Sequence, residues 1–340
     1  DLDAGDVEEA RSTAAVLTAE PIVLEGGEPA ARITFSRDEL GRALTSLFVA
    51  EPEPALELGF DPEVIAEKLA PFTRSLEAPP RDAAFVTTGD DEVIIVPGRS
   101  GTVVDPDLVA AQLLVAAYLP DRLAPLPFAQ GVEPDFTTAD AEALGVVGKV
   151  SEFTTFHPCC QPRVTNIQRM ADLVDGVVVL PGEEFSLNEH VGLRTEENGF
   201  VEAPMILRGE FVPSVGGGVS QFATTLFNAV FYGGYEDVYH QPHSYYFSRY
   251  PEAREATVSF PNPELIFRND TAAALLIRTE HTDESITVKF FGDNEGRRVS
   301  ESLSPRRSFR NPVVEYVTDS GLTPGSEVVL DRGTTGWTVT

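Results

Sequence analysis

Cysteine is nearly absent from the sequence, and the only two, Cys159 and Cys160, are adjacent in TTFHPCCQPR. Neighbouring Cα atoms lie about 3.8 Å apart across a trans peptide, which is below the usual disulfide span of about 4.4–6.8 Å. The pair is therefore either a strained vicinal disulfide or two free thiols. A zinc site with His157 is disfavoured, because two thiols and one imidazole lack a fourth ligand nearby in the sequence.

Basic residues are scarce. There are 25 lysines and arginines against 54 aspartates and glutamates, which gives a net charge of -29, and only three of the basic residues are lysines. Such a chain repels nucleic acid and anionic membrane surfaces at long range. We therefore predict no nucleic-acid partner.

Long apolar runs are also missing. No stretch approaches the roughly 18 apolar residues of a membrane span, and the start, DLDAGDVEEAR, has neither the basic region nor the apolar core of a signal peptide. The abrupt acidic start is what an ectodomain trimmed of an N-terminal membrane anchor would show. With 340 residues, 42% of them hydrophobic, the chain is long enough for two domains with a core each.

Several common site motifs do not occur. The sequence has no GxxxxGK[ST] phosphate loop, no GxGxxG in a dinucleotide-binding context and no HExxH. It also has no calcium loop. We therefore predict neither a cofactor nor a metal ion.

The N-terminal part alternates strand and helix patterns. Strands are expected at 21–26 and 31–36, and a helix at 36–48 begins at Ser36 with Glu39 three residues on. A hairpin is expected around the turn GDD at 89–91. GFDPEVIAEKLA and VVDPDLVAAQLL share a strand, an Asp-Pro helix start and an amphipathic helix, so they are a weak internal repeat or two helices with a common capping device.

The sequence changes character near residues 145–150, after a proline-spaced linker. A helix is expected at 163–176, strands at 177–192 and a hairpin at LRGEF, followed by an apolar helix from Ser220 and strands at 255–260, 274–282 and 285–292. We predict an α+β protein with repeated strand–helix units at 1–145, a mixed α+β domain at 146–295 and a β-rich tail at 296–340 that begins a further β module.

A triple glycine precedes the apolar helix in GGGVSQFATTLFN, residues 216–228. Glycines let the backbone approach closely, and a helix N-terminus favours an anion or a nucleophile with a depressed pKa. One hypothesis makes Ser220 a nucleophile, His243 (or, as a weaker choice, His240) its general base, and the amides of residues 218–221 an oxyanion site. The alternative is that Ser220 only caps the helix.

Other side chains are candidates for recognition. Four arginines stand out in so acidic a chain, because a guanidinium can clamp a carboxylate or phosphate with two hydrogen bonds; ordinary ion pairing is the alternative. Ten aromatic residues between 222 and 250 are either a sugar-stacking cleft or core. The arginines are Arg163, Arg194, Arg249 and Arg254.

Three segments carry a family resemblance. PRVTNIQRMADLVDGVVVLPGEEFSLNEHVGLRTEENGFVEAP, VGGGVSQFATTLFNAVFYGG and HSYYFSRYPEAREATV, with the closing FRNDTAAALLI, resemble the VanW family, named from a vancomycin-resistance cluster, over about 150–292. Upstream, about 20–120 resembles the YoaR-like peptidoglycan-binding domain that commonly precedes VanW domains. Many VanW relatives carry Cys at the position of Ser220, which suits a nucleophile and equally a small buried capping residue.

The resemblance implies a bacterial, extracytoplasmic, cell-envelope protein held by an N-terminal membrane helix, with peptidoglycan or its precursors as the partner. Two functions follow. The first is binding of the wall without turnover, and the alternative is a peptidoglycan-peptide hydrolase or acyltransferase that uses Ser220 and His243. For binding we predict Gly216, Gly217, Gly218, Gln221, Arg163, Asn166, Arg194, His240, Arg249 and Arg254.

Overall fold

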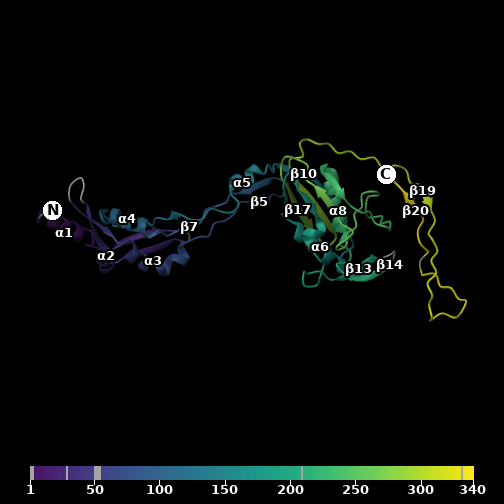
Figure 1. The fold of residues 1–340 in the computed structure, drawn as a ribbon, viewed down its shortest axis with the longest axis horizontal. Coiled ribbons are helices and arrows are strands. Elements are labelled where there is room, and N and C mark those ends of the chain that lie inside the picture. The colour runs from purple at the N-terminus through teal and green to yellow at the C-terminus, as the bar shows by residue number, and fades with distance from the viewer. Residues whose placement is uncertain (1–3, 28–29, 50–54, 208–209, 331) are drawn as a thin grey trace. The chain divides into compact units, whose positions relative to one another are not determined.

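The computed structural model describes residues 4–27, 30–49, 55–207, 210–330 and 332–340. Helices and strands are mixed throughout (Figure 1), so the predicted α+β class is confirmed. The chain divides into two compact units. The first unit comprises residues up to 84 and residues 95–141, and the second comprises 85–94 and 142–340. The sequence analysis predicted a single boundary at 145.

The first unit is built on a small sheet of order β2-β1-β8, in which β1 is antiparallel to β2 and parallel to β8. Leu24 and Ile33 from this sheet and Leu113 from a helix are among its fully buried core residues. The elements are α1 (Ala4–Leu17), β1 (Ile22–Gly26), β2 (Ala31–Phe35), α2 (Arg37–Ala43), β3 (Leu44–Val49), β4 (Ala55–Phe60), α3 (Pro62–Leu76), β7 (Thr102–Val103), α4 (Pro106–Ala117), β8 (Leu123–Pro125) and β9 (Ala129–Gln130).

Local capping chemistry sets the helix starts in this unit. The carboxylates of Asp61 and Asp105 each accept a backbone N–H two residues on, and a proline occupies the first helical position after each. The Asp-Pro device read from the sequence is therefore present in both α3 and α4, which also pack against each other. Ser36 and Glu39 form a reciprocal capping box at α2, as predicted.

The predicted helix at 36–48 is too long. The helix stops at Ala43, and residues 44–49 form β3, which pairs antiparallel with β4. Leu44, Thr45, Leu47, Phe48 and Val49 supply β-branched and apolar side chains, and their pairing partner overrides the helical periodicity.

Hairpin β5 (Ala84–Thr87) and β6 (Val93–Val96) forms around the predicted turn. Its tip belongs to the second unit, where Asp91 lies between two lysines: its carboxylate oxygens are 2.5 Å from Lys149 Nζ and 2.8 Å from Lys289 Nζ. Helix α5 (Thr138–Ala143) begins after Thr137, whose hydroxyl accepts the N–H of Asp140.

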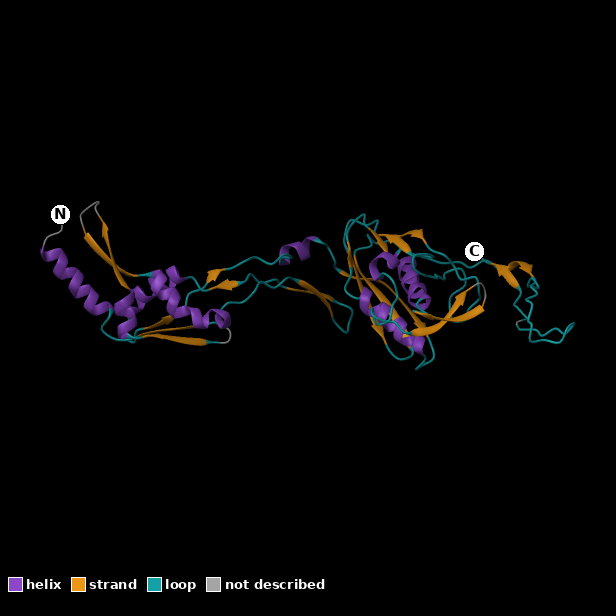
Figure 2. Cartoon of the chain, turned by 60° about the horizontal axis from the view of Figure 1, so that its bottom comes forward, coloured by secondary structure: helices purple, strands orange, loops and turns teal. Residues whose placement is uncertain are grey.

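The second unit has a four-stranded sheet of order β10-β18-β17-β11, all antiparallel. Helices α6 and α8 pack on it (Figures 1 and 2), α6 against β17 and α8 against β10 and β18. Every residue from 221 to 230 of α8 is buried, so this helix is the centre of the core. The elements are β10 (Gly148–Phe156), α6 (Pro162–Val174), β11 (Val178–Val179), β17 (Leu275–His281), β18 (Ser285–Gly292) and α8 (Ser220–Gly233).

A second sheet of order β12-β16-β15 and a hairpin of β13 and β14 complete the domain. The hairpin lies where it was predicted, although residues 208 and 209 of LRGEF are outside the described residues. The expected strand at 255–260 is wrong: this segment has no regular strand. The elements are β12 (Glu184–Ser186), α7 (Leu187–Val191), β13 (Glu202–Leu207), β14 (Glu210–Val215), β15 (Glu236–Tyr239) and β16 (Ile266–Arg268).

The tail contains one two-stranded sheet, β19 (Arg307–Arg310) with β20 (Gly336–Thr338). The strand-like segments at 313–317 and 327–330 form no strand, and Val313 is 93% exposed. Among the described residues no strand pairs with them, and β-propensity alone does not form a strand. Among the described residues, no helix is both long and apolar enough to cross a membrane.

Candidate functional site

The triple glycine forms the turn between β14 and α8. Gly216 and Gly218 have φ angles of 84° and 88°, a conformation that glycine adopts without strain. Gly217 packs so closely on the backbone carbonyl of Ala203 that a Cβ there would overlap it. The turn requires glycine at all three positions: space excludes a side chain at each of them, and Gly216 and Gly218 also need the positive φ.

Two arginines flank this turn. A Cβ built on Gly216 would lie 2.7 Å from the Cβ of Arg194, and one built on Gly218 would lie 2.7 Å from the Cβ of Arg163. Burial lowers the pKa of both arginines, that of Arg194 to about 10 with a partial offset from Glu264. The glycines thus let two arginines, the buried Arg194 and the half-buried Arg163, approach the N-terminus of α8, which itself favours an anion.

Asn166 stabilises the glycine turn through hydrogen bonds to backbone groups. Its side chain is fully buried, and its Nδ2 donates to the carbonyls of Gly217 and Val201, each at 2.9 Å. Its Oδ1 accepts the N–H of Val201 at 2.8 Å. All the hydrogen-bonding groups of this amide therefore go to backbone, so Asn166 is a positioning residue and does not face a ligand.

Gln221 orients Arg163. The Oε1 of Gln221 accepts a hydrogen bond from Arg163 Nη2 at 2.6 Å. Its Nε2 donates to Thr155 Oγ1 at 3.0 Å and to the carbonyl of Phe156 at 3.1 Å, so the amide bridges α8 and the end of β10. The guanidinium of Arg163 is held in place without a carboxylate.

A cationic cluster surrounds Arg163. Arg249 lies over the rings of Phe247 and Tyr250, at 4.4 and 4.8 Å from their centroids. Burial raises the pKa of Tyr250, and the positive charges of Arg249 and Arg163 oppose that rise. Burial lowers the pKa of His157, and the same two arginines lower it further. We define His157, Arg163, Arg249 and Tyr250 as the cationic cluster.

Neither arginine of this cluster forms an ion pair with an aspartate or glutamate in the part of the chain that is described. By contrast, the three lysines, Lys68, Lys149 and Lys289, are all paired with acids. In a chain with twice as many acids as bases, an arginine without a carboxylate partner is suited to receive one from a ligand, and Arg163 is half-buried while Arg249 is exposed to solvent.

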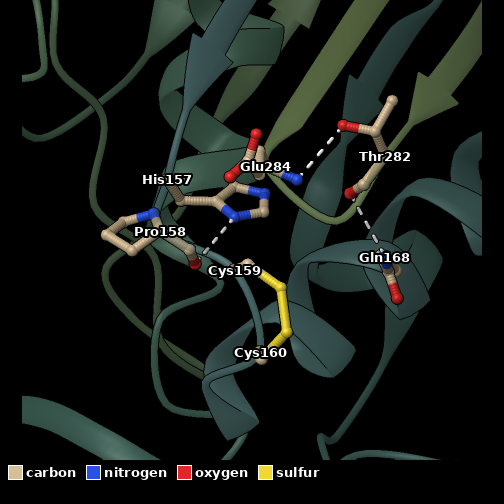
Figure 3. Close-up of a disulfide and its surroundings, with 7 residues drawn as sticks. All are labelled: His157, Pro158, Cys159, Cys160, Gln168, Thr282 and Glu284. Carbon is tan, nitrogen blue, oxygen red and sulfur yellow. Dashed lines mark hydrogen bonds between the residues drawn. A yellow bond between two sulfur atoms is a disulfide. The ribbon is translucent and has the colours of Figure 1, made fainter.

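The two cysteines adjoin the cluster. Their sulfurs are bonded in a vicinal disulfide (Figure 3), and Cys160 has a φ of 71°. The pair lies in the loop from β10 to α6, directly before Gln161, Pro162 and Arg163. In the same loop, the N–H of His157 donates to the carbonyl of Glu284, and the Nε2 of its ring is buried without a hydrogen-bond partner.

The structure does not form the predicted dyad of Ser220 and His243. The Ser220 hydroxyl accepts the N–H of Val258 at 3.2 Å and lies 3.2 Å from the hydroxyl of Thr257. The Nδ1 of His243 lies 3.0 Å from Glu255 Oε2. No hydrogen bond joins the serine to this histidine within the described residues, because each already has a partner on the segment 255–258.

His240 and Arg254 also lie outside the cluster. His240 bonds Asp237 at 2.7 Å and stacks on the ring of Phe227. Arg254 pairs with Glu301 at 2.6 Å and lies over two aromatic rings. Both side chains therefore make the ordinary ion pairs and ring contacts that the sequence analysis gave as the alternative to ligand binding. Among the described side chains, no three of His, Cys, Asp or Glu gather as a metal ion would require.

Sequence reasoning missed two members of the cluster. His157 was considered only as a zinc ligand, and Tyr250 only as one aromatic among ten. No local signal links His157 to Tyr250, because 93 residues separate them in the sequence. Only the packing of α6 and α8 on one sheet brings the two residues together. The aromatic set itself divides, with Phe222 and Tyr235 in the core and Tyr245 and Tyr246 at the surface.

Two family models match parts of this chain. Residues 162–291 match the family model "VanW like protein". The second unit contains a VanW domain. Residues 32–117, which lie in the first unit except for 85–94, match the model "Putative peptidoglycan binding domain". The cationic cluster, the glycine turn and α8 thus belong to the VanW domain or to the loop that precedes it.

One relative covers most of the chain. It is the "Uncharacterized protein YoaR" of Bacillus subtilis (strain 168), which is 28% identical over 283 residues, or 80% of this chain and 89% of that protein. No solved structure shows significant similarity to the chain. The VanW and peptidoglycan-binding domains together support a cell-wall-associated protein.

Proposed function

We propose that this protein binds peptidoglycan or its precursors from the extracytoplasmic side of the cell envelope, through a carboxylate of the stem peptide held in the cationic cluster. The observation that carries the proposal is the pair Arg163 and Arg249, two guanidinium groups beside the hydroxyl of Tyr250, neither of which forms an ion pair with a carboxylate among the described residues. The match to a peptidoglycan-binding model in the other unit agrees with the same partner.

The chemistry suits a carboxylate. A guanidinium offers a planar fork of donors that matches two carboxylate oxygens, and charge-assisted hydrogen bonds are about twice as strong as neutral ones. Burial around Arg163 weakens its hydration, so an incoming anion displaces less water. The rest of the protein, at a net charge of -29, repels anions, so binding depends on this local positive site.

An anchor in the membrane is part of the proposal, because the wall ligand and the acidic surface both suit a protein tethered outside the cytoplasm. No specific contact of Ser220 or His243 favours hydrolysis or acyl transfer among the described residues. The hydroxyl of Ser220 is engaged with the backbone of Val258, and the ring of His243 is directed to Glu255. The binding function therefore stands ahead of the catalytic one.

The test compares matched arginine variants. Purified sacculi are sedimented with the wild type, Arg249→Gln and Arg268→Gln, and a soluble stem peptide is titrated by calorimetry with a free or an amidated C-terminus. Arg268 is the control, because it is paired with Glu184 and Glu236 at the surface. We expect Arg249→Gln to weaken peptide binding about tenfold or more, equivalent to about 1.4 kcal/mol, and Arg268→Gln to leave it unchanged.

Arg163→Gln tests the second arginine of the cluster in the same assays. Its folding is checked by circular dichroism, because the side chain of Arg163 packs on Gly218. Sacculi that retain no more wild-type protein than an unrelated acidic control would refute wall binding. Equal affinity for the free and the amidated peptide would refute the role of the carboxylate, and so would an Arg249→Gln variant as tight as the wild type.

A further inference from the structure

A groove lies beside the cationic cluster, within the second unit. It encloses a cavity of about 730 Å³ between the loop 242–255 of the VanW domain and the segment 333–339 of the tail. This volume falls within the range of about 300–1,000 Å³ that is typical of small-molecule sites. The family match ends at residue 291, so one wall of the groove lies outside the VanW domain.

The groove is built around Trp337, which is held from three directions. Its Nε1 donates to Glu252 Oε2 at 3.3 Å, and the guanidinium of Arg306 lies 4.1 Å from its ring centroid. Tyr246 meets it edge-on at 4.9 Å. Arg306 also pairs with Glu252, so the loop and the tail are joined by a closed set of contacts. The indole is thus a fixed part of the lining.

The lining combines aromatic rings with hydrogen-bond acceptors. Tyr245 and Tyr246 are 38% and 39% exposed, and Glu252 and Glu255 contribute carboxylates, which also bond Arg306 and His243. Aromatic faces carry negative charge density that attracts the polarised C–H groups of a sugar ring. Carboxylates accept hydrogen bonds from hydroxyl and amide N–H groups, but they repel phosphate. This chemistry favours a neutral carbohydrate over an anionic polymer.

The groove adjoins the cluster through one shared ring contact. The ring of His243, which lines the groove, stacks on Tyr250 with centroids 5.4 Å apart and an interplanar angle of 25°. Tyr250 in turn lies beside Arg163 and Arg249. A ligand with a sugar part and an acidic peptide part could therefore occupy both places at once.

We propose that this groove is a glycan subsite that takes a short run of β-1,4-linked N-acetylhexosamine. The inference rests on the proposed function, in which the same ligand offers its peptide carboxylate to the cluster. It deepens that function by assigning the sugar backbone to residues of the 242–255 loop and the tail, with the ring of Tyr246 as an exposed contact surface and Trp337 as its support.

The experiment uses the single tryptophan of the chain as its reporter. Because Trp337 is half-buried in the groove, a bound sugar changes its surroundings, and the emission of the whole protein reports on this one site. A tetrasaccharide of N-acetylglucosamine is titrated into the full chain, and calorimetry supplies a second readout. We expect a saturable change in emission, and at least about tenfold weaker binding for Tyr246→Ala.

The control is Tyr118→Ala, which removes a tyrosine that is 64% exposed and lies at the end of α4 in the other unit. It should bind the tetrasaccharide like the wild type. An emission that does not change with sugar, or a Tyr246→Ala variant that binds as tightly as the wild type, overturns the glycan subsite. A tighter response to poly(glycerol phosphate) than to the tetrasaccharide also overturns it.

Failure of the subsite and failure of the proposed function are distinguishable. Arg249→Gln should lose the stem peptide and keep the tetrasaccharide, whereas Tyr246→Ala should do the reverse. If the peptide binds at the cluster and the sugar does not bind, only the glycan subsite is refuted. If the sugar binds and the peptide does not, only the carboxylate proposal is refuted.

Discussion

Gly218 lies directly against Arg163: a Cβ built on the glycine would be 2.7 Å from the Cβ of the arginine and 3.0 Å from its Nε. The backbone before α8 therefore determines where the guanidinium can lie, and Gln221, three residues on, holds its far end. A substitution in the turn should change recognition as well as stability.

Gly218→Ala tests this coupling. Both Gly218 and Gly182 have positive φ, at 88° and 79°, but no atom lies within 4 Å of a Cβ at Gly182. Gly182→Ala should therefore cost only the left-handed strain of about 1–2 kcal/mol. Gly218→Ala should cost more and also weaken stem-peptide binding, as measured by urea unfolding and calorimetry. Equal losses of stability and unchanged binding in both variants would contradict the coupling.

Ser220→Ala distinguishes a structural hydroxyl from a nucleophile. Two hydroxyls of α8 bridge to the irregular segment 256–258: Ser220 to the N–H of Val258, and Thr224 to both the N–H and the carbonyl of Ala256. Each substitution to alanine should lower the free energy of unfolding by about 1–3 kcal/mol through an unsatisfied backbone group. Muropeptide profiles after incubation should be the same for Ser220→Ala, Thr224→Ala and the wild type. A product found with the wild type and Thr224→Ala but lost in Ser220→Ala would restore the catalytic alternative.

Local signals predicted the helix starts well. The Ser36 and Glu39 pair and the two Asp-Pro starts each depend on hydrogen bonds within three residues of chain, so the sequence contains nearly all the relevant chemistry. Strand positions were harder. The pattern of residues 44–49 predicts a helix, but these residues pair with β4 as a strand. Residues 255–260 alternate as a strand would, but the backbone of this segment forms hydrogen bonds with side chains of α8.

The site was predictable in its parts and not in its arrangement. The glycine turn stood out because three consecutive glycines are entropically costly, and the arginines because acids outnumber bases about two to one; Arg163 and Arg249 do lie together. The pairing of Ser220 with His243 was inferred from nearness in sequence. It does not form because the intervening strand β15 and loop direct the imidazole to Glu255. Long-range packing decides such partners, and one sequence does not contain that information.

Glu39 should make the first unit sensitive to acid. A hydrogen bond from Lys68 is the main cause that lowers its pKa to about 2, with the N–H of Ser36 adding to it. Because the folded pKa lies below the unfolded value, the unfolded state binds more protons between the two. This contribution to stability is complete above about pH 4.5 and is lost as the pH falls through the folded pKa.

Urea unfolding between pH 3 and pH 6 checks this expectation. The wild type should lose more stability across that range than Glu39→Gln, whose amide does not titrate. Glu67→Gln is the control, since this carboxylate lies on the exposed face of α3 and makes no hydrogen bond among the described contacts. Parallel pH curves for the wild type and Glu39→Gln would rule the contribution out.

His157 should add a second pH dependence, at higher pH and in the VanW unit. The groups that face it are the positive charges of Arg163 and Arg249, the carbonyl of Pro158 and the carboxylate of Glu284. Burial is the largest cause that lowers its pKa, so the ring is neutral in the folded protein at pH 7. The unfolded chain has an ordinary histidine with a pKa near 6.5, and it binds the proton first as the pH falls.

Stability from this histidine is therefore complete above about pH 6.5 and declines below it, until the folded ring is protonated as well. The melting temperature of the wild type should fall more between pH 7.5 and pH 5 than that of His157→Gln, whose side chain can still bond the carbonyl of Pro158. His190→Gln is the control, because His190 is exposed and bonds only the carbonyl of Leu173 among the described contacts. His190→Gln should lose as many degrees as the wild type. If His157→Gln also loses as many, the buried imidazole is not the source of the pH dependence. The prediction depends on the buried Nε2 of His157, which has no hydrogen-bond partner in the described structure, so a proton bound there would be unpaired in the interior.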